Sequence, residues 1–336
     1  MSQSNELPPF PENLLIAPLR VISYAKPVAV DLEEEIKLFQ ASKGLGFFYL
    51  DLQHASKKEE TLLSDVDRLF DMAPRFFAIS QEEKEKYDLT KNNGHGYKTL
   101  GQISKDDILS QSPHPIFGPA ILQNHHSLLR RYIESAQSVH TVILQGLSNQ
   151  LGLSPEHSLI NLHRISQPSG DQIRITYAPT SSSTPGEQRM KLGEHTDFGS
   201  LSLLFNRLGG LQVLPPGQTA WHYVRPMKGH AIVNLGDAMV KFTNGLLRSN
   251  IHRVVSPPGS QASLPRVSIV YFMRPDDDTE LKRLEGSELI PALAQNQVEE
   301  VITAKDWIQR RFVMRMKGFF SPETWTQTLG TEARAS

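Results

Sequence analysis

Apolar positions in the first half of the chain recur at the three- and four-residue intervals of amphipathic helices. Residues 58–78 follow this spacing, and residues 127–151 follow it over a longer run. Asp31 precedes three glutamates, which is typical of a capped first helical turn, and Gly44 and Gly46 are expected to end that helix. The first half is therefore predicted to be mainly helical.

From residue 171 onward the pattern changes to short β-like runs separated by Gly and Pro. The predicted strands are 172–177, 200–205, 211–214, 221–224, 230–234, 250–255 and 267–272. So many short strands with frequent turn signals predict a sandwich or barrel, with the earlier helices packed outside it.

The remaining segments are shorter or irregular. Residues 47–50 are predicted to form a buried strand, 28–30 a short strand and 303–317 a last helix, while 1–20 form a Pro-rich arm. Residues 91–124 are rich in Asn, Gly, Ser and Pro, and we expect a long loop there.

Charge and composition narrow the class of partner. The chain has 35 basic and 36 acidic residues and a net charge of −1, so it has no electrostatic footprint for nucleic acid or an anionic membrane. We expect a small-molecule partner and a monomer. No apolar run approaches the roughly 20 residues of a membrane span. Residues 1–15 lack the pattern of a signal peptide, and a cytoplasmic location is expected.

The absence of cysteine excludes several kinds of site. Disulfides, thiolate nucleophiles, iron–sulfur clusters and cysteine-based zinc sites all require a residue that this sequence does not contain. Any metal must therefore be bound by His, Asp or Glu.

Two histidines and one carboxylate are the candidate metal ligands. His195 and Asp197 are separated by one residue, and in an extended segment such positions share a face. Alone, this pair could be a solvated loop pair, and His252 could be a core histidine of the run 250–255. Together, the three side chains have the composition of the facial triad that suits iron(II) and oxygen chemistry.

Arg266 and Ser268 are a candidate anion site. Alternation along the run 267–272 places the guanidinium and the hydroxyl on the same side of the sheet. Arginine binds a carboxylate in a bidentate way, although an ordinary salt bridge at the end of a strand is the alternative.

The string from His195 to Arg266 resembles the isopenicillin-N-synthase-like branch of the iron(II)/2-oxoglutarate-dependent dioxygenases, the iron/ascorbate-dependent oxidoreductase family. Its motif is HxD, a distal His and then RxS, and the likeness covers roughly residues 25–320. The supporting strings are 44–49, 209–213, 234–237 and 244–245. The resemblance implies a mainly β fold with flanking α-helices, in which a double-stranded β-helix (jelly-roll) core follows a helical N-terminal region.

Carried over residue by residue, the resemblance makes His195, Asp197 and His252 the Fe(II) ligands. Arg266 and Ser268 would hold the distal carboxylate of 2-oxoglutarate, with O2 as the oxidant and ascorbate as a candidate reductant. The implied reaction oxidises a C–H bond of a small molecule, by hydroxylation, desaturation or ring rearrangement. The strings look most like those of fungal enzymes acting on secondary metabolites.

The sequence departs from the family at one contact. Family members often add a tyrosine from an Asn-x-Tyr segment to the carboxylate clamp, but here Thr176 and Ala178 occupy those positions. Tyr177 is one residue off and is expected to point to the other face of its strand. Arg266 and Ser268 could therefore hold a substrate carboxylate instead, as in relatives that keep RxS without using 2-oxoglutarate.

Other residues of the motif region are interpreted as structural. The string 234–237 has a structural role, with turns expected at 209–210 and at 236–237 near the metal, and Arg253 is expected to face away from the metal. His222 and His230 are expected to be surface or core residues. By analogy with the family, the substrate contacts would come from Tyr97, Arg174, Leu204 and Phe272, and from the last helix near Phe312 and Phe319. Arg174 could pair with a carboxylate of the substrate.

Three regions are predicted: a helical N-terminal region (1–165), the dioxygenase core (166–320), which forms one structural unit with it, and a C-terminal tail (321–336). Two alternatives remain at this point. One is an iron oxidase of the same fold that does not use 2-oxoglutarate, and the other is a non-catalytic binding protein.

Overall fold

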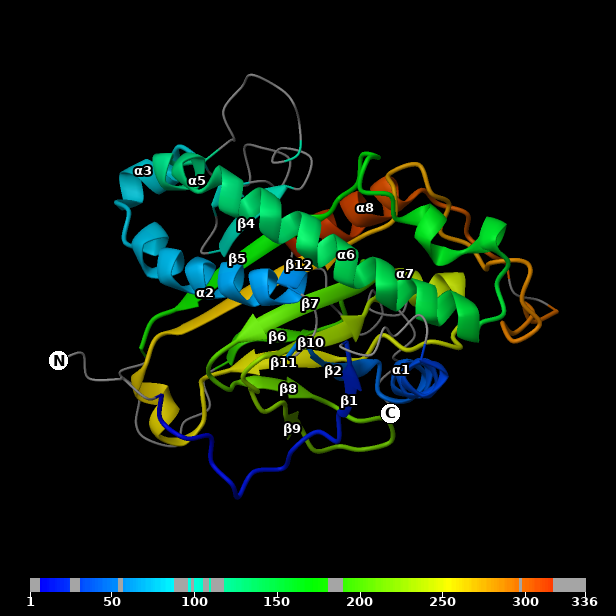
Figure 1. Ribbon diagram of the computed structural model, residues 1–336, viewed down its shortest axis with the longest axis horizontal. Coiled ribbons are helices and arrows are strands. Elements are labelled where there is room, and N and C mark those ends of the chain that lie inside the picture. Colours follow the sequence, from blue (N-terminus) through cyan, green and yellow to red (C-terminus); the bar gives the residue numbers. More distant parts are fainter. Residues whose placement is uncertain are drawn as a thin grey trace.

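Two β-sheets face each other, and helices cover the outer face of the larger sheet (Figure 1). This computed structural model describes residues 7–24, 31–53, 57–87, 96–97, 100–104, 109, 118–180, 190–295 and 298–316. The predicted fold, mainly β with flanking α-helices, is confirmed.

The larger sheet has eight described strands in the order β1-β2-β10-β7-β12-β5-β4-β3. They are β1 (Arg20–Ser23), β2 (Phe47–Asp51), β3 (Gly96–Tyr97), β4 (Leu100–Ser104), β5 (Gln172–Ala178), β7 (Leu201–Asn206), β10 (His230–Leu235) and β12 (Arg266–Met273). The smaller sheet has the order β6-β11-β8-β9. Its strands are β6 (Met190–His195), β8 (Leu211–Val213), β9 (His222–Tyr223) and β11 (His252–Val255).

The helices lie mostly outside this pair of sheets, with α2 and α6 across the larger one (Figure 1). The α-helices are α1 (Leu32–Gly44), α2 (Lys57–Phe77), α3 (Gln81–Glu85), α5 (Ala120–Asn124), α6 (His126–Gln150), α7 (Asp237–Phe242) and α8 (Ala304–Met316). Short 3-10 helices are η2 (Pro155–His157), η3 (Leu159–Leu162) and η4 (Gly259–Ser263). None of the helices in the described ranges is both long and apolar enough to cross a bilayer.

Strand β12 shows how the larger sheet separates a helical core from an interior face. Ile269, Tyr271 and Met273 are buried in the core formed with the helices. The alternate residues of β12 point to the other face, where Val270 packs against the second apolar cluster. That cluster consists of Ala17, Phe47, Tyr49, Leu204, Leu211, Val213, Val224 and Ile232. Both faces of β12 are therefore covered, which fits its continuous apolar run from Ile269 to Met273.

The predicted caps of α1 are present. The Asp31 carboxylate accepts hydrogen bonds from the backbone N–H groups of Glu33 (3.0 Å) and Glu34 (3.2 Å). After the helix, Gly46 has a φ of +69°, which an L-residue rarely adopts. A Cβ at Gly46 would also overlap the backbone carbonyl of Arg248.

Each of the seven runs predicted after residue 171 contains a strand, but the prediction of one long loop over 91–124 is wrong. Strands β3 and β4 and helix α5 lie there, because β5 offers a strand edge with which β4 pairs from Leu100 to Ser104. Strand pairing of this kind overrides a polar, glycine-rich composition. The predicted strand at 28–30 and the tail at 321–336 lie outside the described residues.

The N-terminal region contributes to the larger sheet as well as packing on it. Strands β1 to β4 all precede residue 165 and are hydrogen-bonded into the same sheet as β5, β7, β10 and β12. The boundary at residue 165 stays a prediction.

Gly46→Ala is expected to destabilise the fold by about 3 kcal/mol, since it combines a left-handed backbone with a clash against Arg248. Gly44→Ala is the matched control, because nothing lies within 4 Å of the added methyl group at the end of α1. That change should stabilise the protein by up to about 1 kcal/mol. Urea unfolding measures both, and equal effects of the two substitutions would contradict this account of the turn.

Candidate functional site

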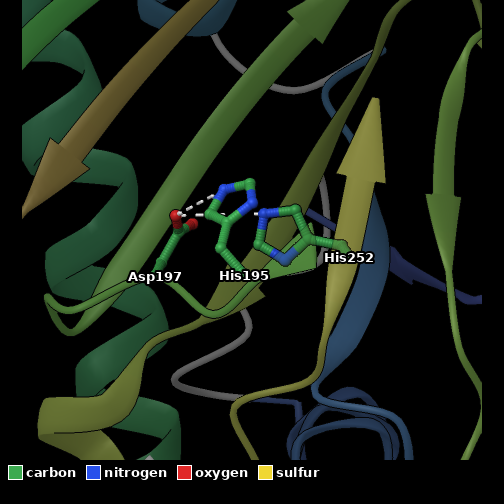
Figure 2. Close-up of side chains that lie close together, drawn as sticks. All are labelled: His195, Asp197 and His252. Carbon is green, nitrogen blue, oxygen red and sulfur yellow. Dashed lines mark ion pairs between the residues drawn. The ribbon is translucent and has the colours of Figure 1, made fainter. Parts of the chain in front are cut away.

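His195, Asp197 and His252 come together where two strands of the smaller sheet meet. His195 ends β6 and His252 begins β11, and the two residues are direct partners in this antiparallel pair. Their ring centroids are 4.2 Å apart. Asp197 follows β6 in the next loop, and Figure 2 shows all three side chains pointing toward one another.

The ligand atoms of the three side chains converge on one point. Nε2 of His195 and Nε2 of His252 are each 3.9 Å from Oδ1 of Asp197. One ligand atom from each residue lies within 4.8 Å of the other two. All three residues are buried, with exposed fractions of 8%, 9% and 6% in sequence order. The group could therefore hold one metal ion.

The second ring nitrogen of each histidine is held by the backbone. Nδ1 of His195 is 2.8 Å from the carbonyl oxygen of Gly193, and Nδ1 of His252 is 3.1 Å from that of Asn250. A carbonyl oxygen only accepts, so each Nδ1 carries the proton. Each Nε2 is then left with its lone pair toward the shared point, as a neutral metal-ligating imidazole requires.

The carboxylate of Asp197 is held in the same manner. Its Oδ2 accepts hydrogen bonds from Ser202 Oγ (2.6 Å) and Asn234 Nδ2 (2.8 Å), which leaves Oδ1 for the shared point. Burial alone would raise the pKa of Asp197, but the positive charge that His252 and His195 carry when protonated, together with these two hydrogen bonds, lowers it below its usual value. The carboxylate is therefore charged at neutral pH.

These donors fit a divalent transition metal. Two imidazole nitrogens and one carboxylate oxygen, all with fixed orientations, form a three-ligand set that leaves coordination positions open. A fully liganded structural site would need a fourth protein ligand. Among the described residues, the only group of three or more such side chains close enough to hold one ion is this one.

The loop that carries Asp197 is fixed by a buried ion pair that sequence reasoning missed. Thr196 Oγ1 donates to Asp237 Oδ2 (3.0 Å), and the backbone N–H of Asp237 donates to the carbonyl of Asp197 (2.8 Å). Arg311 Nη2 of helix α8 donates to the same Oδ2 at 2.8 Å. Gly236 and Asp237 were predicted to form a tight turn near the metal; in the structure Gly236 is the N-cap of helix α7 and Asp237 is its first residue.

Helix α8 is docked on this loop by aromatic contacts as well. The Arg311 guanidinium lies 4.9 Å from the ring centre of Phe198 and 5.2 Å from that of Trp307. Trp307 Nε1 donates to the carbonyl of Phe198 (3.3 Å). The spacing of Trp307 and Arg311, four residues apart on one helix, was the only sequence signal for this contact.

Arg266 and Ser268 lie on the same side of β12, as predicted, and that side is the interior face, where both residues are 4% exposed. Arg266 Nε donates to the carbonyl of Gly209 (2.7 Å), and Nη1 donates to Ser268 Oγ. No acidic side chain among the described residues forms an ion pair with Arg266. Burial lowers its pKa to about 10, so the guanidinium is still charged at neutral pH.

Strand β5, where the sequence departs from the family's carboxylate clamp, has the side-chain directions that were predicted. Ala178 is paired directly with Arg266 across β5 and β12, so the position of the family tyrosine is next to the guanidinium but carries only a methyl group. Thr176 is paired with Ser268. Tyr177 points to the opposite face and stacks on Phe77 of α2, with ring centroids 5.3 Å apart.

Three of the residues predicted to contact a substrate share the interior face. Arg174 and Leu204 are both paired with Val270, and the Arg174 guanidinium lies 4.6 Å from the ring centre of Phe272. Tyr97 lies in β3, but its side chain is outside the described structure. Phe312 lies on α8, and Phe319 is outside the described residues.

The residues interpreted as structural are not in the metal cluster. Arg253 points away from it, donating to Gln212 Oε1 (2.7 Å) and lying 4.2 Å from the ring centre of Trp221. His222 approaches the carbonyl of Ile16, and His230 approaches that of Lys228.

Known proteins resemble the chain over almost its whole length. Residues 155–275 match the 2OG-Fe(II) oxygenase superfamily, and residues 21–119 match the N-terminal region described as non-haem dioxygenase in morphine synthesis. A 2-oxoglutarate-dependent dioxygenase of Aspergillus fumigatus is 31% identical, with 89% of this chain and 86% of that protein covered. The 2-oxoglutarate-dependent dioxygenase frbH of a Dothideomycetidae species is 29% identical, with 88% and 89% covered.

Solved structures support the fold. A Neurospora crassa protein in complex with alpha-KG and thymine has a TM-score of 0.74 at 22% identity, covering 91% of this chain and 98% of that one. The rice dioxygenase for auxin oxidation has a TM-score of 0.64 at 20% identity, covering 89% and 96%. These likenesses confirm the predicted jelly-roll core.

Arg311→Met is expected to weaken Fe(II) binding at least tenfold, because the loop between His195 and Asp197 loses the partner that fixes Asp237. Arg310→Met is the matched control, since that neighbouring arginine pairs with Glu300 at the surface. Arg311→Lys, which keeps the charge, should lose less. Anaerobic calorimetric titration of Fe(II) into the metal-free proteins measures this, after circular dichroism has shown each variant folded. Equal affinities for Arg311→Met and Arg310→Met would refute the prediction.

Proposed function

We propose that this chain, which belongs to the 2OG-Fe(II) oxygenase superfamily, oxidises a C–H bond of a small molecule at a metal held by His195, Asp197 and His252. The family assignment makes it an oxidoreductase that uses Fe(II), 2-oxoglutarate and O2. The observation that carries the residue assignment is the convergence of Nε2, Oδ1 and Nε2 on one point, with the other polar atom of each side chain already bound.

The bound metal and co-substrate would supply the oxidising chemistry: 2-oxoglutarate and O2 become succinate and CO2, and the second oxygen atom oxidises the substrate. The protein's own contribution is orientation. Asp197 brings one negative charge to the site, and its hydrogen bonds from Ser202 and Asn234 keep that charge aimed at the metal position. Phe47, an apolar residue of the interior face, packs edge-on against His252 with ring centroids 5.3 Å apart, and it would help to exclude water there.

Arg266 and Ser268 are proposed to bind the distal carboxylate of 2-oxoglutarate. A buried guanidinium without an acidic partner among the described residues is costly unless an anion joins it. Strand β11 connects the metal position to this clamp. Val255 lies three residues after His252, roughly 10 Å along the strand. Its backbone N–H donates to the carbonyl of Gly210, which lies beside Arg266. An interval of this size suits an extended five-carbon diacid that reaches from the metal to the clamp.

Because the family tyrosine is missing from the clamp, two alternatives are compared with the main proposal, and each predicts a different reaction outcome. An iron oxidase that keeps RxS would use Arg266 and Ser268 for a substrate carboxylate, and it would consume O2 without forming succinate. A binding protein would do neither. The names of the relatives, 2-oxoglutarate-dependent dioxygenases, favour the main proposal over both.

The substrate is proposed to lie against Arg174, Leu204 and Phe272 on the interior face, and Tyr97 stays a candidate contact. Arg174 stacked on Phe272 would suit a substrate that carries a carboxylate beside an apolar body. The fungal relatives support a role in secondary metabolism. We propose a monomer that acts in the cytoplasm.

Succinate release across a panel of small fungal metabolites tests the function. Wild-type protein should form succinate in an Fe(II)-dependent manner, and the right substrate should raise its rate. Arg266→Met should weaken 2-oxoglutarate binding by roughly 100-fold, because two charge-assisted hydrogen bonds are lost. Oxygen uptake without succinate would support the oxidase instead.

Arg174→Gln tests the proposed substrate class. For a panel substrate with a carboxylate, the KM should rise at least tenfold while the Kd for 2-oxoglutarate stays within twofold of wild type. The matching amide or ester of the same compound should be handled equally by both proteins. A carboxylate substrate whose KM is unchanged in the variant would remove Arg174 from the substrate site.

A further inference from the structure

The amide of Gln261 connects the N-terminal arm to the residue that holds Arg266. Gln261 lies in η4 and is 3% exposed. Its Oε1 accepts from the backbone N–H of Gly209 (2.9 Å), and its Nε2 donates to the carbonyl of Pro8 (2.9 Å). Both ends of this buried amide are therefore satisfied by backbone groups from distant parts of the chain.

Gly209 carries this connection to the clamp. While its N–H is bound by Gln261, its carbonyl accepts from Arg266 Nε (2.7 Å). A Cβ on Gly209 would lie 2.6 Å from the ring of Phe10 and 2.8 Å from Pro258, so the arm packs directly on this glycine. Its backbone is thus fixed from both sides.

The arm is itself anchored to the smaller sheet. In Figure 1 its blue trace begins beside the yellow turn of η4 and runs along the lower edge of the molecule to β1. The backbone N–H of Tyr223 donates to the carbonyl of Leu15 (2.7 Å), and that of Ala17 donates to Tyr223 (2.8 Å). Phe10 meets the Tyr223 ring edge-on, with centroids 6.1 Å apart.

We infer that Gln261 and the arm segment 8–17 are positioning elements of the 2-oxoglutarate clamp, an inference that rests on the proposed role of Arg266. Arg266 has no acidic partner among the described residues to orient it, so the Gly209 carbonyl and Ser268 determine where its guanidinium points. Bidentate recognition of a carboxylate depends on that orientation. The arm therefore contributes to co-substrate affinity, although it comes from the opposite end of the sequence.

Gln261→Leu tests the inference. In the full-length, Fe(II)-loaded protein under anaerobic conditions, its Kd for 2-oxoglutarate, measured by calorimetry, should rise about tenfold. Its affinity for Fe(II) should be unchanged. Binding of 2-oxobutyrate, a keto-acid without the distal carboxylate, should also be unchanged, because that ligand does not reach the clamp.

Gln137→Leu is the matched control for a purely structural role. Gln137 is equally buried and uses both ends of its amide, donating to the carbonyl of His163 (3.0 Å) and accepting from Tyr271 (3.0 Å). It lies on α6, on the helical side of the larger sheet. Its loss should lower the unfolding midpoint without changing the Kd for 2-oxoglutarate.

A double variant tests whether Gln261 acts through Arg266. Gln261→Leu combined with Arg266→Met should bind 2-oxoglutarate no more weakly than Arg266→Met alone. If Gln261→Leu does not fold, Phe10→Ala, which loosens the arm from outside, should raise the same Kd.

These measurements distinguish failure of the proposed function from failure of the inference about Gln261. A wild-type protein that does not bind 2-oxoglutarate would refute the proposed function itself. A Gln261→Leu protein that binds it as wild type does, while Arg266→Met is weakened, would overturn only this inference. So would equal weakening by Gln137→Leu.

Discussion

The buried carboxylate of Asp197 is the group around which the site is organised. A charge in this position is tolerated because Ser202 and Asn234 donate hydrogen bonds to one oxygen, while the other oxygen and the two imidazole Nε2 atoms face the position of a metal cation. Those donors come from β7 and β10 of the larger sheet, while the histidines come from β6 and β11 of the smaller one. The metal position therefore exists only when both sheets are packed together, which couples the chemistry to the fold.

The alternation of side chains along the larger sheet gives it two distinct faces. One face is apolar and packs against α2 and α6. The other carries apolar residues and a few polar ones, among them Ser202, Asn234, Arg266 and Ser268. Because the period of a strand is two residues, a shift of one would exchange the faces and send the clamp into the helical core. The register of β12 is thus as important to the site as the identity of Arg266.

The parts of the site predicted from sequence are those that depend on local alternation. Two pairs have members two residues apart and therefore on one side of the chain: His195 with Asp197, and Arg266 with Ser268. By the same alternation Tyr177, one residue from the family's tyrosine position, points to the opposite face. Asp237, Arg311 and Gln261 were missed as site residues because their partners lie in other elements, and the four-residue spacing of Trp307 and Arg311 does not indicate what that side of the helix contacts. For the same reason the strands within 91–124 were predicted as a loop, since their pairing depends on β5.

The most direct test of the account is an anaerobic titration of 2-oxoglutarate into the Fe(II)-loaded protein, followed by visible absorption. The wild-type protein should give a saturable charge-transfer band. Asp197→Ala should give no band because it does not retain iron, and Arg266→Met should reach the same band only at much higher concentrations. A wild-type protein that binds iron but gives no band, or an Arg266→Met titration identical to wild type, would contradict it.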